Sequence, residues 1–171
     1  MIETKRLMIR EMVYSDYEAL CKILCDEEVM HIGYGSAFNL EEAQNWLHRH
    51  FKRYKECGFG FWAVVLKETS EMIGQCGLTM QNWKGKEILE IGYSFQKAHW
   101  HKGYATESAI ACKEYAFSVL DANQVYSIIR DTNIASQKVA IGNGMKIIDK
   151  DTRNFRNIDM ELFLYCVERT K

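Results

Sequence analysis

A junction between an expected strand and an expected helix reads Trp100-His101-Lys102-Gly103-Tyr104-Ala105-Thr106-Glu107. Helical periodicity begins at Ala105, but no serine, threonine, aspartate or asparagine stands where a side chain would cap the helix. The first backbone N–H groups therefore lack a side-chain acceptor. A glycine ahead of them lets the backbone turn so that several N–H groups point to one place. With the positive end of the helix dipole, this predicts an anion site that has His101 and Lys102 at its rim.

A simpler interpretation stays open, in which Gly103 makes a tight turn and water satisfies the start of the helix. The spacing matches neither the GxxxxGK[ST] loop of P-loop NTPases nor the GxGxxG fingerprint of dinucleotide-binding proteins. The sequence therefore disfavours both of those classes, while the anion site keeps its place as a prediction.

The composition is that of an ordinary folded domain. The chain has 171 residues, of which 47% are hydrophobic and 26% charged, with 11 glycines and no proline. A net charge of −1 gives no indication of a nucleic-acid partner. No apolar run approaches the roughly 18 residues that would suggest a membrane span. Because no repeat, linker or low-complexity tract divides the chain, we expect a single domain over residues 1–171.

The amino-terminal residues and the six cysteines indicate the compartment. Residues 1–6 have no apolar run after their charges, so they do not resemble a secretory signal. A core of this size needs no disulfides, which favours reduced thiols in a cytoplasmic protein. Cys21 and Cys25 are one helical turn apart with no second ligand pair, so we expect no metal there.

Hydrophobic periodicity predicts a mixed α/β fold, with a sheet of about seven strands and helices on both of its faces. Strands are expected at residues 2–11, 58–66, 72–80, 87–95, 124–130, 145–148 and 158–167. Helices are expected near residues 15–24, 39–54, 105–119 and 133–141. Residues 31–38 contain two glycines and are predicted to form a mobile loop between the first two helices.

Five motifs follow one another along nearly the whole chain: Thr4-Lys5-Arg6-Leu7-Met8-Ile9-Arg10, Glu90-Ile91-Gly92-Tyr93, the junction at 100–107, Asn133-Ile134-Ala135-Ser136 and Gly144-Met145. Together they resemble the GNAT acetyltransferases, and within that family the RimJ/RimL-type branch that acetylates the N-termini of ribosomal proteins. The resemblance implies a twisted mixed sheet whose fourth and fifth strands splay apart. It also implies acetyl-CoA as co-substrate, with no metal.

The resemblance assigns a set of residues to acetyl-CoA binding: Tyr93, Ser94, Phe95, His101, Lys102, Gly103, Tyr104, Ala105, Thr106 and Asn133. In the family's R/Q-x-x-G-x-G/A loop, Trp100 replaces the first polar residue, as is common in the RimL-type branch. His101 stands where that branch usually has glycine, which should narrow the conformational freedom of the loop. The His101 N–H can still donate a hydrogen bond, so binding is expected to persist.

The resemblance also suggests two residues for proton transfer. Glu90 resembles the catalytic glutamate of histone-acetylating relatives and is the candidate base, although its spacing to the glycine loop differs by one residue. A bulge would then turn it away, and a structural glutamate that ties down a neighbouring strand is the alternative. Ser136 is the candidate acid for the leaving thiolate, because residues 139–141 lack the tyrosine that many relatives use. Solvent is the alternative proton donor.

The expected partners are acetyl-CoA and a primary amine, without nucleic acid or membrane. A protein N-terminal α-amine is the leading acceptor, and polyamines, amino acids or antibiotics form the second class. A non-catalytic acyl-CoA-binding module and a metal protein built on His99, His101 and Cys112 are the other classes considered. Because many relatives form dimers, a homodimer is one oligomeric state that the resemblance allows.

Overall fold

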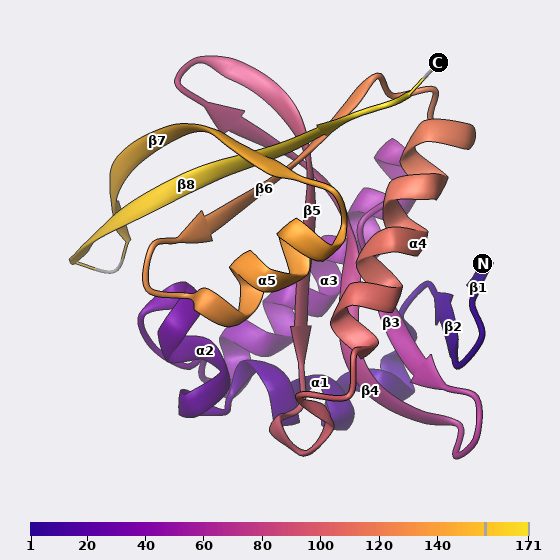
Figure 1. Ribbon diagram of the computed structural model, residues 1–171. Coiled ribbons are helices and arrows are strands. Elements are labelled where there is room, and N and C mark those ends of the chain that lie inside the picture. Colours follow the sequence, from indigo (N-terminus) through magenta and orange to yellow (C-terminus); the bar gives the residue numbers. More distant parts are fainter. Residues whose placement is uncertain (156, 171) are drawn as a thin grey trace.

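The computed structural model describes residues 1–155 and 157–170, which form one open sheet with helices on both faces (Figure 1). The mixed α/β class expected from periodicity is confirmed. The helices are α1 (Tyr17–Leu24), α2 (Glu27–Tyr34), α3 (Leu40–Cys57), α4 (Tyr104–Ser118) and α5 (Ile134–Gly142). The strands are β1 (Ile2–Glu3), β2 (Leu7–Arg10), β3 (Phe61–Leu66), β4 (Glu71–Trp83), β5 (Lys86–Phe95), β6 (Gln124–Arg130), β7 (Lys146–Phe155) and β8 (Ile158–Glu168).

The sheet separates in its middle. Its strand order is β1-β2-β3-β4-β5-β6-β8-β7, and every neighbouring pair is antiparallel except β5 and β6, which run parallel. These two strands share the register pair Glu90↔Tyr126 and then diverge towards their carboxyl ends (Figure 1). Beyond that pair, the Ser127 hydroxyl donates to the Ile91 carbonyl at 2.8 Å, in place of a backbone ladder. The predicted splay between the fourth and fifth strands lies here.

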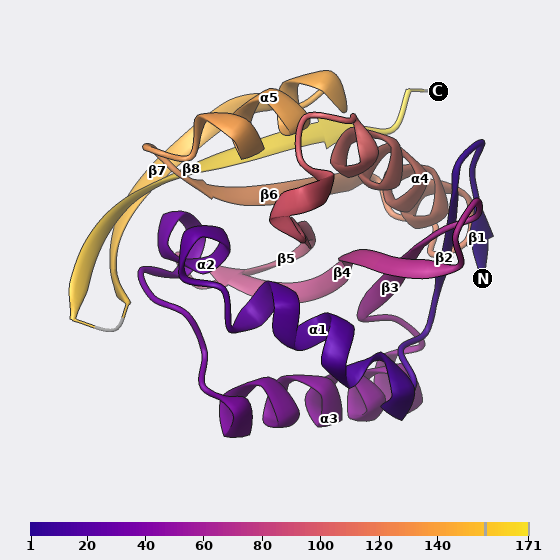
Figure 2. The ribbon, with the colours of Figure 1, turned by 90° about the horizontal axis from the view of Figure 1, so that it is seen from below.

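Helices cover the two faces of the sheet unequally. Figure 2 shows α1, α2 and α3 on one side and α4 and α5 on the other. Along β3 the side chains alternate: Val64 packs in the core under α4, and Ala63 and Val65 pack in the core under α1 and α3. The small buried residues Ala109 and Cys112 let α4 lie close to the sheet, as the sequence predicts. Within the described residues, no helix is long and apolar enough to cross a membrane.

The sheet has eight strands where about seven were expected, because residues 2–11 do not form one strand. The Thr4 N–H donates to the Leu7 carbonyl at 2.9 Å, so β1 folds back on β2. Glu107 of α4 fixes this turn, since its carboxylate accepts from the Thr4 hydroxyl at 2.6 Å and the Arg6 N–H at 2.9 Å. A contact between residues about a hundred positions apart is not visible in local periodicity.

The predicted mobile loop at residues 31–38 is wrong in its first half, because α2 runs to Tyr34. The Asp26 side chain caps this helix by accepting from the Glu28 N–H at 2.9 Å. Gly33 lies inside the helix, and Gly35 ends it in a left-handed conformation with φ of 82°. A capping aspartate followed by two glutamates is a sequence signal for the start of α2. The two glycines in residues 31–38 nevertheless favoured a loop over a helix in the prediction.

Candidate functional site

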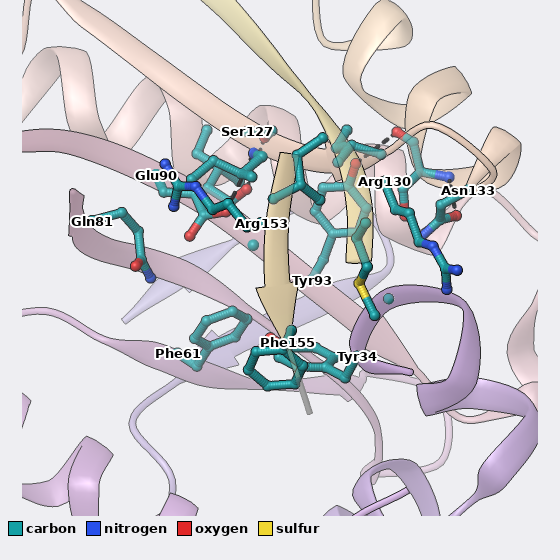
Figure 3. A pocket seen from close by; sticks show the side chains of 18 of the residues that line it. Tyr34, Phe61, Gln81, Glu90, Tyr93, Ser127, Arg130, Asn133, Arg153 and Phe155 are labelled. Atoms are coloured by element: carbon teal, nitrogen blue, oxygen red, sulfur yellow. Dashed lines mark hydrogen bonds between the residues drawn. The ribbon is translucent and has the colours of Figure 1, made fainter. Parts of the chain in front are cut away.

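Two cavities meet where β5 and β6 diverge. The first, which we call the loop cavity, has a volume of about 560 Å³ and lies between residues 99–106, the end of β5 and the start of α5. The second, the sheet cavity, has a volume of about 690 Å³ and lies between α3 and the strands β4 to β8 (Figure 3). The residues that line both cavities are Gly33, Tyr34, Tyr93, Asn133 and Ser136. The helix α2, expected as a loop, therefore supplies part of the shared wall.

The structure gathers most of the predicted site residues around the loop cavity. Its lining includes Tyr93, Ser94, Phe95, His101, Gly103, Tyr104, Ala105, Thr106, Asn133 and Ser136. Lys102 is not among the lining residues; its side chain is exposed and its carbonyl accepts from the Arg6 guanidinium at 2.9 Å. Glu90 lies across the divergence and lines the sheet cavity. Ser136 lines both cavities, so the two candidate proton-transfer residues share the sheet cavity, while only Ser136 also borders the loop cavity.

The start of α4 has the geometry that the sequence predicts for an anion site. Gly103 precedes the helix with φ of 78°, and no side chain caps the first N–H groups. His101 also adopts a left-handed conformation, with φ of 61°, which is uncommon for a residue with a side chain. The backbone reverses at both positions, as in loops that direct successive N–H groups to a bound anion.

Arg6 holds this loop in place, a role that local sequence patterns do not reveal. Its guanidinium donates to the Lys102 carbonyl and lies 4.5 Å from the centre of the Tyr104 ring. It also pairs with the Glu107 carboxylate at 2.7 Å. Burial alone would raise the pKa of Glu107. The hydrogen bonds from Thr4 and Arg6 together lower it by more, so the pKa of Glu107 lies below its ordinary value. The conspicuous Thr4-Lys5-Arg6 motif at the start of the chain was the only available signal.

Glu90 points into the sheet cavity beside Gln81 and Arg153 (Figure 3). The register between β4 and β5 is unbroken, with Glu90 opposite Thr79, so no bulge turns the carboxylate away. Burial raises the pKa of Glu90 to about 7, and hydrogen bonds from Ile128, Gln81 and Thr79 only partly offset that rise. Its carboxylate accepts from the Ile128 N–H at 3.3 Å, so it also touches the neighbouring strand. This contact is longer than an ordinary N–H···O bond.

Tyr93, Asn133 and Ser136 form a linked group at the shared wall. The Tyr93 hydroxyl donates to the Ser136 carbonyl at 2.8 Å, and burial raises the pKa of that hydroxyl. The Asn133 side chain accepts from the Ser136 N–H at 3.1 Å, which makes Asn133 the N-cap of α5. Asn133 therefore caps α5 and also lines both cavities, so one side chain can serve the helix and the site.

Several residues of the sheet cavity were not predicted from the sequence, among them Arg49, Arg53, Gln81 and Arg153, whereas Tyr34 lies in the segment 31–38 that the sequence had singled out. Burial raises the pKa of the Tyr34 hydroxyl, and the charge of Glu90 adds to that rise. Two of the arginines belong to α3, where polar residues recur every three or four positions along the cavity side. That spacing was visible in the sequence, but it is equally typical of a solvated helix face.

The residues of the metal alternative lie in different surroundings. The Cys112 thiol is buried 3.5 Å from the Cys76 thiol, whereas His101 is exposed. His99 lies 3.8 Å from Glu71. Across residues 1–155 and 157–170, no group of three histidine, cysteine, aspartate or glutamate side chains is placed to hold a metal ion.

Comparison with known proteins gives a consistent assignment. Residues 6–146 match the acetyltransferase (GNAT) domain family. The uncharacterized N-acetyltransferase p20 of Bacillus licheniformis is 29% identical over 137 residues, which cover 80% of this chain and 76% of p20. A GNAT-family acetyltransferase from Bacillus anthracis has a similar structure, with a TM-score of 0.82, 24% identity and coverage of 98% and 97% of the two chains.

The ribosomal L7/L12 alpha-N-protein acetyltransferase RimL, solved in complex with coenzyme A, is also similar. Its TM-score is 0.80 at 16% identity, with 96% of this chain and 95% of that chain covered. At such identities the two solved structures establish the fold. The resemblance noted from the motifs is thereby confirmed at the level of the family and its fold.

Proposed function

Because the chain belongs to the GNAT acetyltransferase family, we propose that it transfers the acetyl group of acetyl-CoA to the α-amine of a protein N-terminus. The observation that carries the proposal is the meeting of two cavities at Tyr93, Asn133 and Ser136, with Glu90 just beyond. One cavity suits a co-substrate with a phosphate end, and the other suits an acceptor. A small amine, such as a polyamine, amino acid or antibiotic, is the alternative acceptor.

The loop cavity fits coenzyme A through features of this chain alone. The N–H groups that follow Gly103 have no side-chain acceptor, so they would donate hydrogen bonds to the pyrophosphate oxygens. The carboxyl end of β5 at residues 93–95 borders the gap and would pair with the amides of the pantetheine arm. Asn133 and Ser136 would lie beside the end of that arm. The thioester supplies an activated acetyl group when it is bound.

In the sheet cavity, Glu90 would take the proton from the attacking amine, directly or through one water. An α-amine with a pKa of about 7.7–8.0 costs only about 1 kcal/mol to deprotonate at pH 7. A carboxylate whose pKa is raised to about 7 is well matched to that task. A lysine side chain near pKa 10.4 would cost about 4.6 kcal/mol and would need a stronger base. This match favours an α-amine over a lysine.

Replacing Ser136 with alanine is expected to lower kcat about tenfold without changing KM for acetyl-CoA. Ser136 lines both cavities, and the proposal places its hydroxyl beside the leaving thiolate. Its backbone contacts with Tyr93 and Asn133 remain in the alanine variant, which keeps the local fold. Steady-state kinetics with varied acetyl-CoA at a saturating concentration of the acceptor measure both quantities. An unchanged kcat would mean that solvent protonates the thiolate.

Replacing Gly103 with alanine is expected to weaken coenzyme A binding by about tenfold, because the left-handed conformation costs an alanine roughly 1–2 kcal/mol. The observed φ of 78° at Gly103 is what imposes that cost. Calorimetric titration with coenzyme A measures the change. Gly85→Ala is a matched control, since Gly85 is also left-handed, with φ of 87°, but lies in the turn between β4 and β5. Equal coenzyme A affinity in the Gly103→Ala and wild-type proteins would contradict the anion site.

A transfer screen tests the proposed function as a whole. Coenzyme A release and product mass would be followed with N-terminal peptides, with the same peptides after blocking of the α-amine, and with polyamines and aminoglycosides. We expect acetylation of the free α-amine, and loss of the product when that amine is blocked. Transfer confined to small amines would support the alternative acceptor class. Tight binding of acetyl-CoA without any transfer would instead identify a non-catalytic acyl-CoA-binding module.

A further inference from the structure

The charged side chains that line the sheet cavity are unbalanced. Among the described residues, four arginines line it, namely Arg49, Arg53, Arg130 and Arg153, against the two glutamates Glu42 and Glu90. A cavity that accepts an amine next to a catalytic carboxylate has no evident need for so many cations. The partners of each arginine therefore decide what the excess charge can do.

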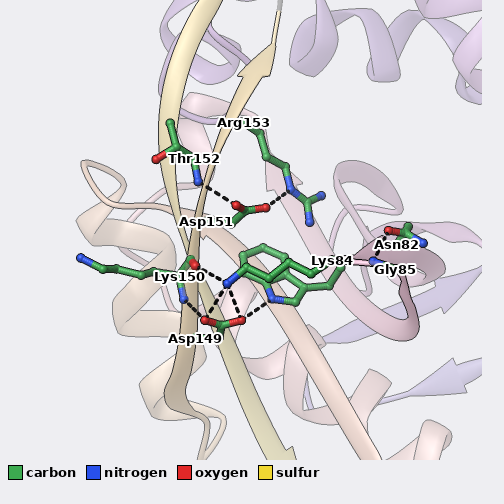
Figure 4. A network of polar contacts seen from close by, with 9 residues as sticks. Asn82, Lys84, Gly85, Asp149, Lys150, Asp151, Thr152 and Arg153 are labelled. Carbon is green, nitrogen blue, oxygen red and sulfur yellow. Dashed lines mark hydrogen bonds and ion pairs between the residues drawn. The ribbon is translucent and has the colours of Figure 1, made fainter.

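Two of these arginines are engaged by the protein itself. Arg153 pairs with Asp151 at 3.1 Å, and its guanidinium lies 4.5 Å from the centre of the Trp83 ring. Figure 4 shows this pair beside a second contact, in which Asp149 accepts from Lys84 at 2.9 Å. Arg130 donates to the carbonyl of His31 in α2 at 3.4 Å. These contacts fix β7 and α2 around the cavity.

Arg49 and Arg53 differ, because neither lies within 4 Å of an acidic side chain among the described residues. They are one turn apart on α3, where like charges repel. Burial lowers the pKa of Arg53, and the charge of Arg49 lowers it further. The Arg49 guanidinium lies 5.8 Å from the centre of the Trp46 ring, on the wall of the cavity. Two repelling cations thus line the cavity without a direct ion pair among the described residues, and the more distant charge of Glu90 only partly offsets their repulsion.

The Tyr34 hydroxyl relates these arginines to the proposed base. Tyr34 lines the same cavity as Glu90, Arg49 and Arg53. Glu90 comes from the sheet, and the arginines come from the helix opposite. The cavity therefore has an anionic wall, suited to an amine, facing a cationic wall, suited to an anion.

From this juxtaposition we propose that the amine acceptor carries an anionic group, a carboxylate or a phosphate, that Arg49 and Arg53 bind. The inference rests on the proposed transfer to an amine and narrows its acceptor. Guanidinium groups bind both anions through paired N–H donors. A peptide with an acidic side chain near its N-terminus satisfies the requirement, and so does a small amine that bears its own carboxylate. Polycationic acceptors, such as polyamines and aminoglycosides, would meet the arginine pair unfavourably.

The test compares acceptors that differ only in charge. Peptides amidated at the carboxyl end, so that the varied side chain is their only carboxylate, would carry aspartate, asparagine or lysine at position two, three or four. Aspartic acid α-amide, a small molecule with the same two groups, distinguishes a small acceptor from a peptide. Transfer would be measured as kcat and KM, and binding to the enzyme–coenzyme A complex would be measured by calorimetry.

Wild-type enzyme is expected to prefer the aspartate peptide over the asparagine peptide by about tenfold, chiefly through KM and Kd. The Arg49→Gln/Arg53→Gln variant should lose that preference, and the Arg49→Glu/Arg53→Glu variant should favour lysine. The Lys52→Gln/Lys55→Gln variant, which removes two exposed cations from the same helix, should keep the wild-type preference for the aspartate peptide. Equal affinity for the charged and neutral peptides, or a preference unchanged in the glutamine variant, would overturn the inference. Selective binding without transfer would leave it standing while refuting the proposed function.

Discussion

Replacing Glu90 with glutamine is expected to lower kcat/KM for an α-amine acceptor by about a hundredfold, with little effect on coenzyme A affinity. Glutamine keeps the shape of the side chain and an oxygen for the Ile128 N–H, but it cannot accept a proton from the amine. Glu90 lines the sheet cavity and not the loop cavity, so coenzyme A binding should be unaffected. Steady-state kinetics and calorimetry of both proteins measure the two quantities.

The pH dependence gives the sharper signature. Glu90 acts as a base only when it is ionised, and burial raises its pKa to about 7. Wild-type kcat/KM should therefore rise as the pH increases through about 7, whereas the glutamine variant should retain only the ionisation of the amine at about 7.7–8.0. Glu87→Gln is the matched control, because Glu87 lies on the same strand with an exposed side chain. A wild-type profile and rate in Glu90→Gln would exclude Glu90 as the base.

Above pH 7 the Glu90→Gln variant should be less active than wild type but have a higher free energy of unfolding. The pKa of Glu90 is raised from 4.5 to about 7 by burial, so its contribution to stability is present below about pH 4.5 and lost as the pH rises through 7. Above pH 7 the glutamine variant should therefore be more stable than wild type, by roughly 1–3 kcal/mol. A variant that is slower but more stable in that range has not lost activity through misfolding.

Replacing Gly77 with alanine is expected to destabilise the protein by about 3 kcal/mol or more. Gly77 of β4 pairs with Phe61 of β3, and a Cβ at position 77 would lie 2.0 Å from the Gly60 carbonyl oxygen and 2.6 Å from the Phe61 Cα. Both are backbone atoms, so relief requires β3 to move away from β4. Chemical denaturation followed by circular dichroism measures the free energy of unfolding.

Gly33→Ala is the comparison for that experiment. A Cβ at Gly33 would meet no atom within 4 Å, and the residue lies inside α2. Alanine favours helix interiors over glycine by about 0.5–1 kcal/mol, so this variant should be as stable as wild type or slightly more stable. If Gly77→Ala unfolded at the same denaturant concentration as Gly33→Ala, the close approach of β3 to β4 would be refuted.

Much of the fold could be predicted because its elements carry local signals. The uncapped start of α4, its small buried face and the N-cap Asn133 all follow from residues that are near one another in sequence. The turn between β1 and β2 could not be predicted, because it depends on Glu107, far along the chain. β7 was expected at residues 145–148 but extends to Phe155, since it is a mostly exposed edge strand without regular apolar alternation.

The candidate site likewise has a part that could be predicted from local sequence and a part that could not. The loop residues were identified because an unusual local conformation requires an unusual local sequence, here a glycine before an uncapped helix. The residues of the sheet cavity come from separate elements, so their relation appears only in three dimensions. Arg49 and Arg53 resemble a solvated helix face until β7 and β8 are seen to close the cavity opposite them. Spacing alone also gave no means of telling whether Glu90 faces inward.

The most direct test of the proposed mechanism is a crystal structure with a bisubstrate analogue, in which the sulfur of coenzyme A is joined through an acetyl bridge to a peptide α-amine. We expect the bridge to lie at the shared wall of Tyr93, Asn133 and Ser136, with the peptide nitrogen directed to Glu90 or to a water that Glu90 binds. A peptide nitrogen that points away from the sheet cavity, with Glu90 bonded only to β6, would contradict it.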